Sequence, residues 1–151
     1  MSKVNAGFFT DLVHCEVRLY NHFDSELRSA HGIVTSQYEF LRHLRDHENQ
    51  RTTDLAAEFA IGVGAVSKAI DRLEARGLVS REPNPANRRS TILQLTADGR
   101  ALIGAADATF QRRIAEILAK AGTPEQVAAA AALLSSLRST LERDRLGIPI
   151  G

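Results

Sequence analysis

Cysteine is almost absent from this sequence. Cys15 is the only one among 151 residues, so the chain can form neither an internal disulfide nor a cysteine-rich zinc framework. This scarcity is typical of proteins that work in a reducing cytosol. The length and the 44% of hydrophobic residues suit one compact domain that needs no covalent cross-links. We therefore expect a single domain, residues 1–151, in the cytoplasm.

Long hydrophobic runs are also missing. The most apolar stretch, residues 127–134, is far shorter than the roughly 20 apolar residues that cross a bilayer. The first residues show no basic stretch followed by an apolar segment and a small-residue cleavage site, as a secretory signal would. We expect a protein that is neither exported nor bound to a membrane.

The motifs of common enzyme classes are absent as well. The sequence contains no glycine-rich phosphate loop, no G-x-S-x-G elbow and no H-E-x-x-H pair, which are the signatures of several kinds of hydrolase and nucleotide-binding enzyme. We therefore expect no enzyme, no catalytic residues, no cofactor and no metal site.

Neither sign of charge predominates over the whole chain, since the net charge is only +1. The distribution is uneven, however. Between residues 68 and 89 six basic side chains outnumber three acidic ones; the basic ones are Lys68, Arg72, Arg76, Arg81, Arg88 and Arg89. A local basic patch is what phosphate neutralisation requires, although a solvated charged surface has the same composition.

Apolar residues that recur every three or four positions predict six helices. Gly32 and Gly77 are placed to end two of them, Ser36 with Glu39 resembles a capping box, and Thr123, Pro124 and Gln126 form a clear helix start. The expected helices cover residues 5–30, from 35–36 to 46, 53–59, 64–76, 97–121 and 124–141. Residues 78–82 and 91–95 read as two strands that a polar loop, 83–90, separates.

The middle of the chain has the pattern of a DNA-reading unit. A short helix, a tight turn and a second helix place that second helix in the major groove of DNA in many proteins. Gly64 and Ala65 are small enough to let its backbone approach the bases, while Lys68 and Arg72 carry donors for base edges or phosphates. The basic hairpin that follows is a candidate wing, in which Arg88 or Arg89 could enter a narrow minor groove.

These residues resemble those of the multiple-antibiotic-resistance regulator (MarR) family, over nearly the whole chain. The matching segments are 55–56, 66–67, 71–79, Arg81, 87–89 and 95–100. Two positions depart from the family pattern. Asn87 stands where the family usually has the wing Asp, whereas Arg89 occupies the expected position. Arg89 therefore lacks the charged partner that the family's Asp would provide. Gly62 stands where a Ser or Asn cap is common, at a cost of only a few tenths of a kcal/mol.

The resemblance implies a mostly α (α+β) fold, a winged helix-turn-helix with a small β-hairpin wing and long N- and C-terminal dimerisation helices. Residues 52–95 would be the DNA-binding lobe, and 5–34 with 97–146 the dimerisation region. It further implies a ligand-responsive homodimeric repressor that recognises a two-fold symmetric site in double-stranded DNA. The candidate DNA-binding residues are Thr53, Gly64, Ala65, Ser67, Lys68, Arg72, Arg81, Asn87, Arg88 and Arg89.

Two further sets follow from the same resemblance. A pocket for a small aromatic or lipophilic effector would be lined by Tyr20, Phe23, Tyr38, Arg42 and His43. The dimer interface would include Phe8, Leu12, Val127, Leu134, Leu137 and Leu141. The apolar stripes of the two end regions support pairing independently, because one small domain cannot bury them all. An intramolecular helical bundle is the alternative.

Other functions remain open at this point. A winged-helix module could bind proteins or ligands without binding DNA. Cys15 could serve a thiol-based redox sensor, as in one branch of the family, although its place in an apolar stripe favours simple packing. His43 and His47, one helical turn apart, have a spacing that can hold a metal ion, but no later histidine could complete the site.

Overall fold

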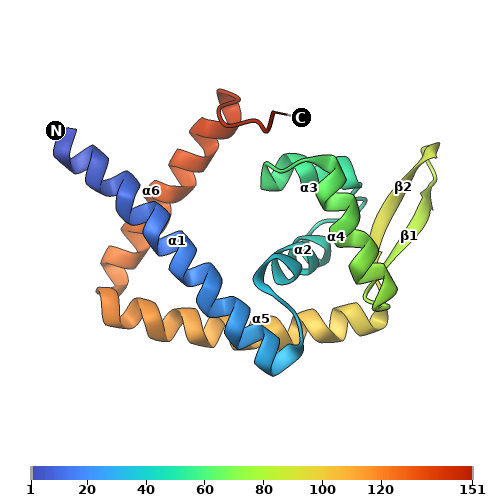
Figure 1. The fold of residues 1–151 in the computed structure, drawn as a ribbon, viewed down its shortest axis with the longest axis horizontal. Coiled ribbons are helices and arrows are strands. Elements are labelled where there is room, and N and C mark those ends of the chain that lie inside the picture. The colour runs from blue at the N-terminus through green and yellow to red at the C-terminus, as the bar shows by residue number, and fades with distance from the viewer. Residues whose placement is uncertain (1, 151) are drawn as a thin grey trace.

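The computed structural model describes residues 2–150, and these form six helices and one β-hairpin (Figure 1). In chain order the elements are α1 (Ser2–His31), α2 (Thr35–Asp46), α3 (Thr52–Phe59), α4 (Val63–Ala75), β1 (Val79–Asn84), β2 (Asn87–Leu95), α5 (Ala97–Ala121) and α6 (Pro124–Arg143). The mostly helical class with one hairpin is confirmed. The two end residues of the predicted domain, 1 and 151, lie outside the described range.

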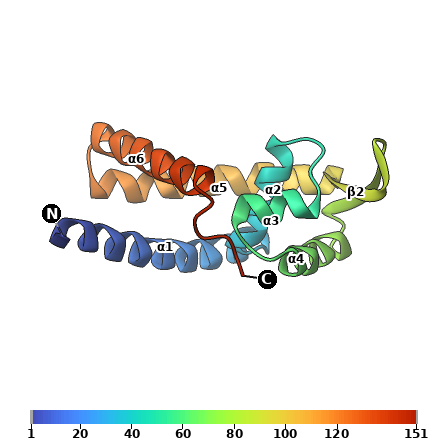
Figure 2. The ribbon, with the colours of Figure 1, turned by 90° about the horizontal axis from the view of Figure 1, so that it is seen from above.

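The elements divide into a compact lobe and an open pair of arms. Helices α2, α3 and α4 pack with the hairpin at one end, while α5 extends from the hairpin to the far end, where α6 turns back (Figures 1 and 2). The first half of α1 also extends away from the lobe, and this segment and α6 are called the arms below. None of the helices described has an apolar stretch long enough to span a bilayer.

The core lies where the second half of α1 meets α2 and α5. The Phe110 ring of α5 stacks on Tyr38 of α2 with centroids 4.6 Å apart, and on Phe23 of α1 at 4.3 Å. The lobe continues this core through the apolar sides of α3, α4 and the hairpin. Helix α6 contributes no buried side chain, so its apolar stripe is uncovered in a single chain.

Most predicted helix ends are confirmed. Gly32, directly after α1, and Gly77, two residues after the end of α4, adopt positive φ angles of 68° and 73°, a conformation that glycine reaches without the penalty of a Cβ. At the start of α6 the Thr123 hydroxyl accepts a hydrogen bond from the Gln126 amide at 3.2 Å, and the Gln126 side chain accepts one from the Thr123 amide at 2.9 Å.

The predicted capping pair of α2, Ser36 with Glu39, is wrong, although the helix starts within the expected range. The helix begins at Thr35, and the side chain that caps it is Gln37, whose Oε1 accepts a hydrogen bond from the Val34 amide at 3.0 Å. Thr35 is buried and donates its hydroxyl proton to the Tyr20 carbonyl. Glu39 therefore has no capping role, because it lies two residues beyond Gln37, the position from which a side chain caps this helix.

The predicted loop in the hairpin is also wrong. The strands continue to Asn84 and from Asn87, so only two residues separate them. The asparagine side chains make this tight turn possible: Asn84 Oδ1 accepts from the Ala86 amide, and Asn87 Oδ1 accepts from the Arg89 amide, both at 3.0 Å. The polar sequence that suggested a loop thus forms exposed strands that project from the lobe (Figure 1).

The first turn of helix α5 packs closely against the start of the hairpin. The Thr96 hydroxyl donates to the Gly77 carbonyl at 2.6 Å and accepts from the Gly99 amide at 3.0 Å, which caps the helix. A Cβ atom at Gly99 would overlap the Leu78 carbonyl oxygen. The hairpin and the first turn of α5 therefore form one close-packed unit.

Candidate nucleic-acid interface

Helix α4 has one buried side and one exposed side, with the spacing that its sequence predicts. Val66, Ile70 and Leu73 are completely buried against the lobe. The residues on the opposite side are exposed, namely Gly64, Ala65, Lys68, Asp71 and Arg72, and Ser67 is half-buried at the edge. The small residues lie at the N-terminal end of this surface, so the helix backbone there is open to a ligand.

The six basic residues of the patch fall into two groups. Arg76 donates to the Gly32 carbonyl at 2.9 Å, and Arg81 pairs with carboxylates. The other four make no side-chain hydrogen bond or ion pair with any residue in the range 2–150; they are Lys68, Arg72, Arg88 and Arg89. Two of these lie on α4 and two on β2 next to the turn, so the unpaired positive charge is shared by the helix and the hairpin.

Arg81 differs from the other predicted DNA-binding residues because it has partners within the protein. Its guanidinium lies 2.8 Å from Asp71 and 2.9 Å from Glu74, and it also donates to the Ser67 carbonyl. The side chain is only 22% exposed, and its donors are used within the protein. Arg81 therefore holds β1 against α4 and neutralises the two acids of that helix, a role that sequence order alone did not distinguish from a DNA contact.

The wing turn orients Arg89 through its backbone. Asn87 accepts a hydrogen bond from the Arg89 amide, where the family's Asp was expected to pair with the guanidinium. The Arg88 and Arg89 side chains remain exposed. Thr53, in the first turn of α3, is exposed as well, so every predicted DNA-binding residue other than Arg81 and the half-buried Ser67 lies on the surface.

The predicted effector residues do not lie together. Phe23 and Tyr38 are core residues, which corrects their assignment to a pocket, and Tyr20 is 38% exposed. The Tyr38 hydroxyl donates to Asp107 Oδ1 at 2.6 Å, and burial together with this bond raises the pKa of Tyr38. Arg42 and His43 do line a cavity, between α2, α3 and α6. The polar partner that explains the buried phenol, Asp107, was missed because it is 69 residues distant in sequence.

The predicted interface residues are open to solvent in the single chain. Phe8, Leu134 and Leu141 are each 41% exposed, and Leu12, Val127 and Leu137 are half-buried. Helix α1 adds a second apolar stripe that sequence analysis missed, formed by Phe9, Val13 and Val17. Its spacing of four residues was the available signal. In a single chain this stripe and the apolar stripe of α6 are exposed to solvent, and only contact with another chain would bury them.

Two other candidates gain no support from the coordinates. Cys15 is exposed in the single chain and not packed as a small core residue, which corrects that expectation. Within residues 2–150 no group of three or more histidine, cysteine, aspartate or glutamate side chains is placed to hold a metal ion. His43 and His47 stack face to face instead, with ring centroids 4.1 Å apart.

A helix pair with an exposed second helix, followed by a hairpin that projects beside it, defines a winged helix-turn-helix protein. The sequence model of the MarR family matches residues 34–91. An HTH-type transcriptional repressor of Mycobacterium tuberculosis is 30% identical over 95 residues, which are 63% of this chain and 68% of that protein. The chain belongs to the MarR family.

Other relatives and solved structures agree with this. The uncharacterized regulator YdgJ of Bacillus subtilis is 32% identical over 95 residues, which are 63% of this chain. The chain spans 58% of the length of YdgJ and 46% of the repressor NicR of Pseudomonas putida. Among structures, a cysteine-to-serine variant of E. coli MarR in complex with operator DNA has a TM-score of 0.73 at 26% identity, covering 90% of this chain and 95% of that one. BldR of Sulfolobus solfataricus, at 22% identity and a TM-score of 0.78, shares the fold over 92% of this chain and 95% of its own.

Proposed function

We propose that this protein is a transcriptional repressor that binds duplex DNA as a homodimer. The observation that carries the proposal is the set of four unpaired cations, Lys68, Arg72, Arg88 and Arg89, on the exposed side of α4 and beside the wing turn. Side chains without internal partners can neutralise phosphates at no cost in lost protein contacts. A protein that binds chromosomal DNA in this way works in the cytoplasm and needs no catalytic group.

Residues 52–95 serve as the DNA-binding lobe in this proposal. Gly64 and Ala65 let α4 enter the major groove, Lys68 and Arg72 contact base edges or phosphates, and Arg89 enters the minor groove. The proposed DNA-binding surface also includes Thr53, Ser67, Asn87 and Arg88. The E. coli MarR variant solved with operator DNA supports this arrangement, since its fold matches nearly the whole chain.

Residues 5–34 and 97–146 form the dimer in this proposal. The exposed apolar residues of α1 and α6 are too many for a lone soluble chain, because contiguous apolar patches on a monomer surface mark interaction sites. A two-fold dimer repeats the lobe and favours a two-fold symmetric operator. A small aromatic or lipophilic effector would act by changing how the two lobes are spaced.

The salt dependence of duplex binding tests the proposal. Selection of bound sequences from a random duplex pool supplies an operator, and its affinity is then measured by fluorescence anisotropy at several salt concentrations. We expect a two-fold repeat and a log-log slope near −0.9 for each phosphate contacted. A shallow slope, or no enrichment of any sequence, would indicate instead a winged-helix module that binds proteins or ligands.

A further inference from the structure

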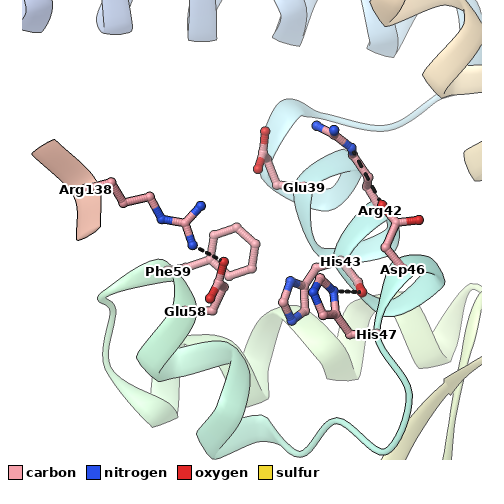
Figure 3. Close-up of a pocket in the computed structure, with 8 residues that line it drawn as sticks. All are labelled: Glu39, Arg42, His43, Asp46, His47, Glu58, Phe59 and Arg138. Atoms are coloured by element: carbon pink, nitrogen blue, oxygen red, sulfur yellow. Dashed lines mark hydrogen bonds and ion pairs between the residues drawn. The ribbon is translucent and has the colours of Figure 1, made fainter. Parts of the chain in front are cut away.

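A cavity of about 440 Å³ lies between α2, α3 and α6 (Figure 3). One side of helix α2 contributes Glu39 and His43, and His47 follows directly after the helix. The end of α3 contributes Glu58 and the Phe59 ring. Small-molecule sites in proteins have volumes of roughly 300–1,000 Å³, so this cavity is large enough for a compact organic ligand.

The arginines of this cavity already face carboxylates. Arg138 of α6 lies 2.5 Å from Glu58 and 2.7 Å from Glu142. Arg42 lies 4.0 Å from Asp46, one turn further along α2. An anionic ligand would therefore have to displace a carboxylate before it could pair with Arg138, whereas the Arg42 side chain is 42% exposed and makes no hydrogen bond within the described residues.

The hydrogen bonds of the two histidines fix which nitrogen of each ring remains free. Gln50 Nε2 donates to the Glu48 carbonyl, so its Oε1 is the atom 2.9 Å from His43 Nε2 and accepts from it. His47 Nδ1 lies 3.0 Å from the His43 carbonyl oxygen and must donate to it. His43 Nδ1 and His47 Nε2 are consequently lone-pair acceptors when the rings are neutral.

Glu39 is the third hydrogen-bond acceptor of the cavity, and it supplies a negative charge that pairs with no described side chain. Its half-buried carboxylate makes no hydrogen bond or ion pair with any residue of the described chain, and it points toward the space in front of Arg138 (Figure 3). Burial raises the pKa of the Glu39 carboxyl, and Arg42 and Arg138 only partly oppose this. A desolvated carboxylate without a partner gains free energy when a positive donor reaches it.

We propose that this cavity binds a small organic cation, an amidinium or ammonium group on a flat or apolar skeleton, with Glu39 as its counter-ion. Glu39 and the free ring nitrogens of His43 and His47 accept hydrogen bonds, so a ligand that contacts these three groups is rich in donors. Phe59, whose ring lies edge-on to His43 with centroids 5.7 Å apart, supplies an aromatic surface for the cation or its skeleton.

Such a ligand would also act on the contact between the arms and the lobe. The Arg138–Glu58 pair joins α6 to α3 at the edge of the cavity. A second cation beside Glu58 competes with Arg138 for that carboxylate and weakens the link. The lobe would then change its position relative to α6, and this regulatory consequence rests on the DNA binding proposed above.

Calorimetry on the full chain without DNA tests the binding itself. The probes are benzamidinium, its neutral isostere benzamide and the anion benzoate, which differ little in shape. We expect benzamidinium alone to bind in the millimolar range or tighter. Glu39→Gln should weaken it by about tenfold or more, whereas Glu125→Gln, which removes the same charge from the far end of α6, should leave it unchanged.

A second measurement needs no variant. Proton NMR of the wild-type chain follows the ring signals of His43 and His47, which benzamidinium should shift and benzoate should not. No shift and no heat with benzamidinium, equal or tighter binding of benzoate, or equal losses for the two glutamine variants would each overturn the proposal.

DNA binding is measured separately so that the two proposals can fail independently. Benzamidinium that binds but leaves the affinity for the selected operator unchanged would refute the regulatory consequence alone. Benzamidinium that binds to a chain with no affinity for any duplex would refute the proposed function and leave the cation site standing.

Discussion

Arg81 and Arg89 are two arginines of one hairpin with different surroundings. Arg81 is held by Asp71 and Glu74, while Arg89 is exposed and without a partner among residues 2–150. We expect Arg81→Ala to lower the free energy of unfolding by about 1 kcal/mol, because two ion pairs and their fixed geometry are lost. Urea denaturation of wild type and variant measures this directly.

Arg89→Ala should behave in the opposite way. Its effect on stability should stay within about 0.5 kcal/mol, as for most surface substitutions. DNA binding should weaken mainly on operators with A·T-rich flanks, where the minor groove is narrow. Anisotropy titrations with A·T-rich and G·C-rich flanks separate the two cases, and an equal loss on both would mean that Arg89 only contacts phosphates.

The ionisation of Asp107 makes the stability of the folded protein depend on pH. Burial would raise the pKa of its carboxyl, but hydrogen bonds from Tyr38, Arg45 and Gln111 outweigh burial and lower it. A carboxyl with a lowered pKa in the folded state stabilises the fold above its unfolded value, near 4, and that contribution is lost as the pH falls through the folded value. We expect Asp107→Asn to be less stable than wild type at pH 7, and the difference to shrink below about pH 4.

Thermal unfolding at pH 7 and pH 3 measures this difference. Tyr38→Phe is the matched control, because it removes one donor and keeps the carboxylate with its Arg45 pair at 3.1 Å. It should cost about 1 kcal/mol and lose part of the pH dependence, because the Tyr38 bond is the largest of the interactions that lower the pKa of Asp107. If Asp107→Asn showed the same acid sensitivity as wild type, the carboxyl would not be the group that titrates.

For single residues, the sequence predicts which side chains are buried or exposed better than it predicts what each side chain contacts. The exposed cations of α4 follow from helix periodicity alone, as do the buried Val66, Ile70 and Leu73. The partners of Arg81 and Tyr38 lie across other elements. Long-range polar contacts of this kind leave no periodic pattern in the chain, so sequence analysis placed Arg81 on DNA and Tyr38 in a pocket.

Glycines in α5 give an internal comparison at the scale of one helix. Gly99 has no room for a Cβ atom against the Leu78 carbonyl, whereas Gly104 has no atom within 4 Å of that position. We expect Gly99→Ala to destabilise the fold by about 1–3 kcal/mol through forced displacement of backbone. Gly104→Ala should stabilise it by about 0.5–1 kcal/mol, since alanine is the better helix former. Denaturation midpoints of both variants measure the contrast, and a stabilising Gly99→Ala would show that the hairpin and α5 can separate cheaply.

Elements were predictable where local chemistry alone decides them. The period of the apolar residues located all six helices, and the Thr123 cap located the start of α6. One helix cap and one loop were predicted wrongly. Gln37 caps α2 in place of Ser36 and Glu39, and the polar residues after Pro83 pair as strands because the two asparagines close a shorter turn.

The arms decide the behaviour of the whole molecule. Leu134 of α6 is 41% exposed in the single chain, and a charge at this position would be desolvated in a dimer interface. We expect Leu134→Glu to shift the protein to monomers at micromolar concentration in analytical ultracentrifugation, and to lose operator affinity in parallel. Leu134→Met keeps the apolar contact and should remain dimeric. A monomeric wild type would contradict the proposed function from the start.

The arrangement of the whole chain was predictable from its resemblance to a family, but its cavities were not. The order of helices, hairpin and long end helices follows from patterns along the sequence. The space between α2, α3 and α6 depends on the angle at which α6 turns back at Gly122. No local pattern encodes that angle, and of the five residues predicted to line a pocket only Arg42 and His43 lie at this cavity.

The close fit of Gly99 on Leu78 makes α5 a rigid lever. The helix has 25 residues and is about 37 Å long, so a tilt of about 5° at its Gly122 end carries the hairpin through about 3 Å. That displacement is comparable to the reach of one hydrogen bond. A signal received at the Gly122 end is thus magnified along α5, and the displacement at the wing is larger than that of the core residue Phe110, which lies nearer to Gly122.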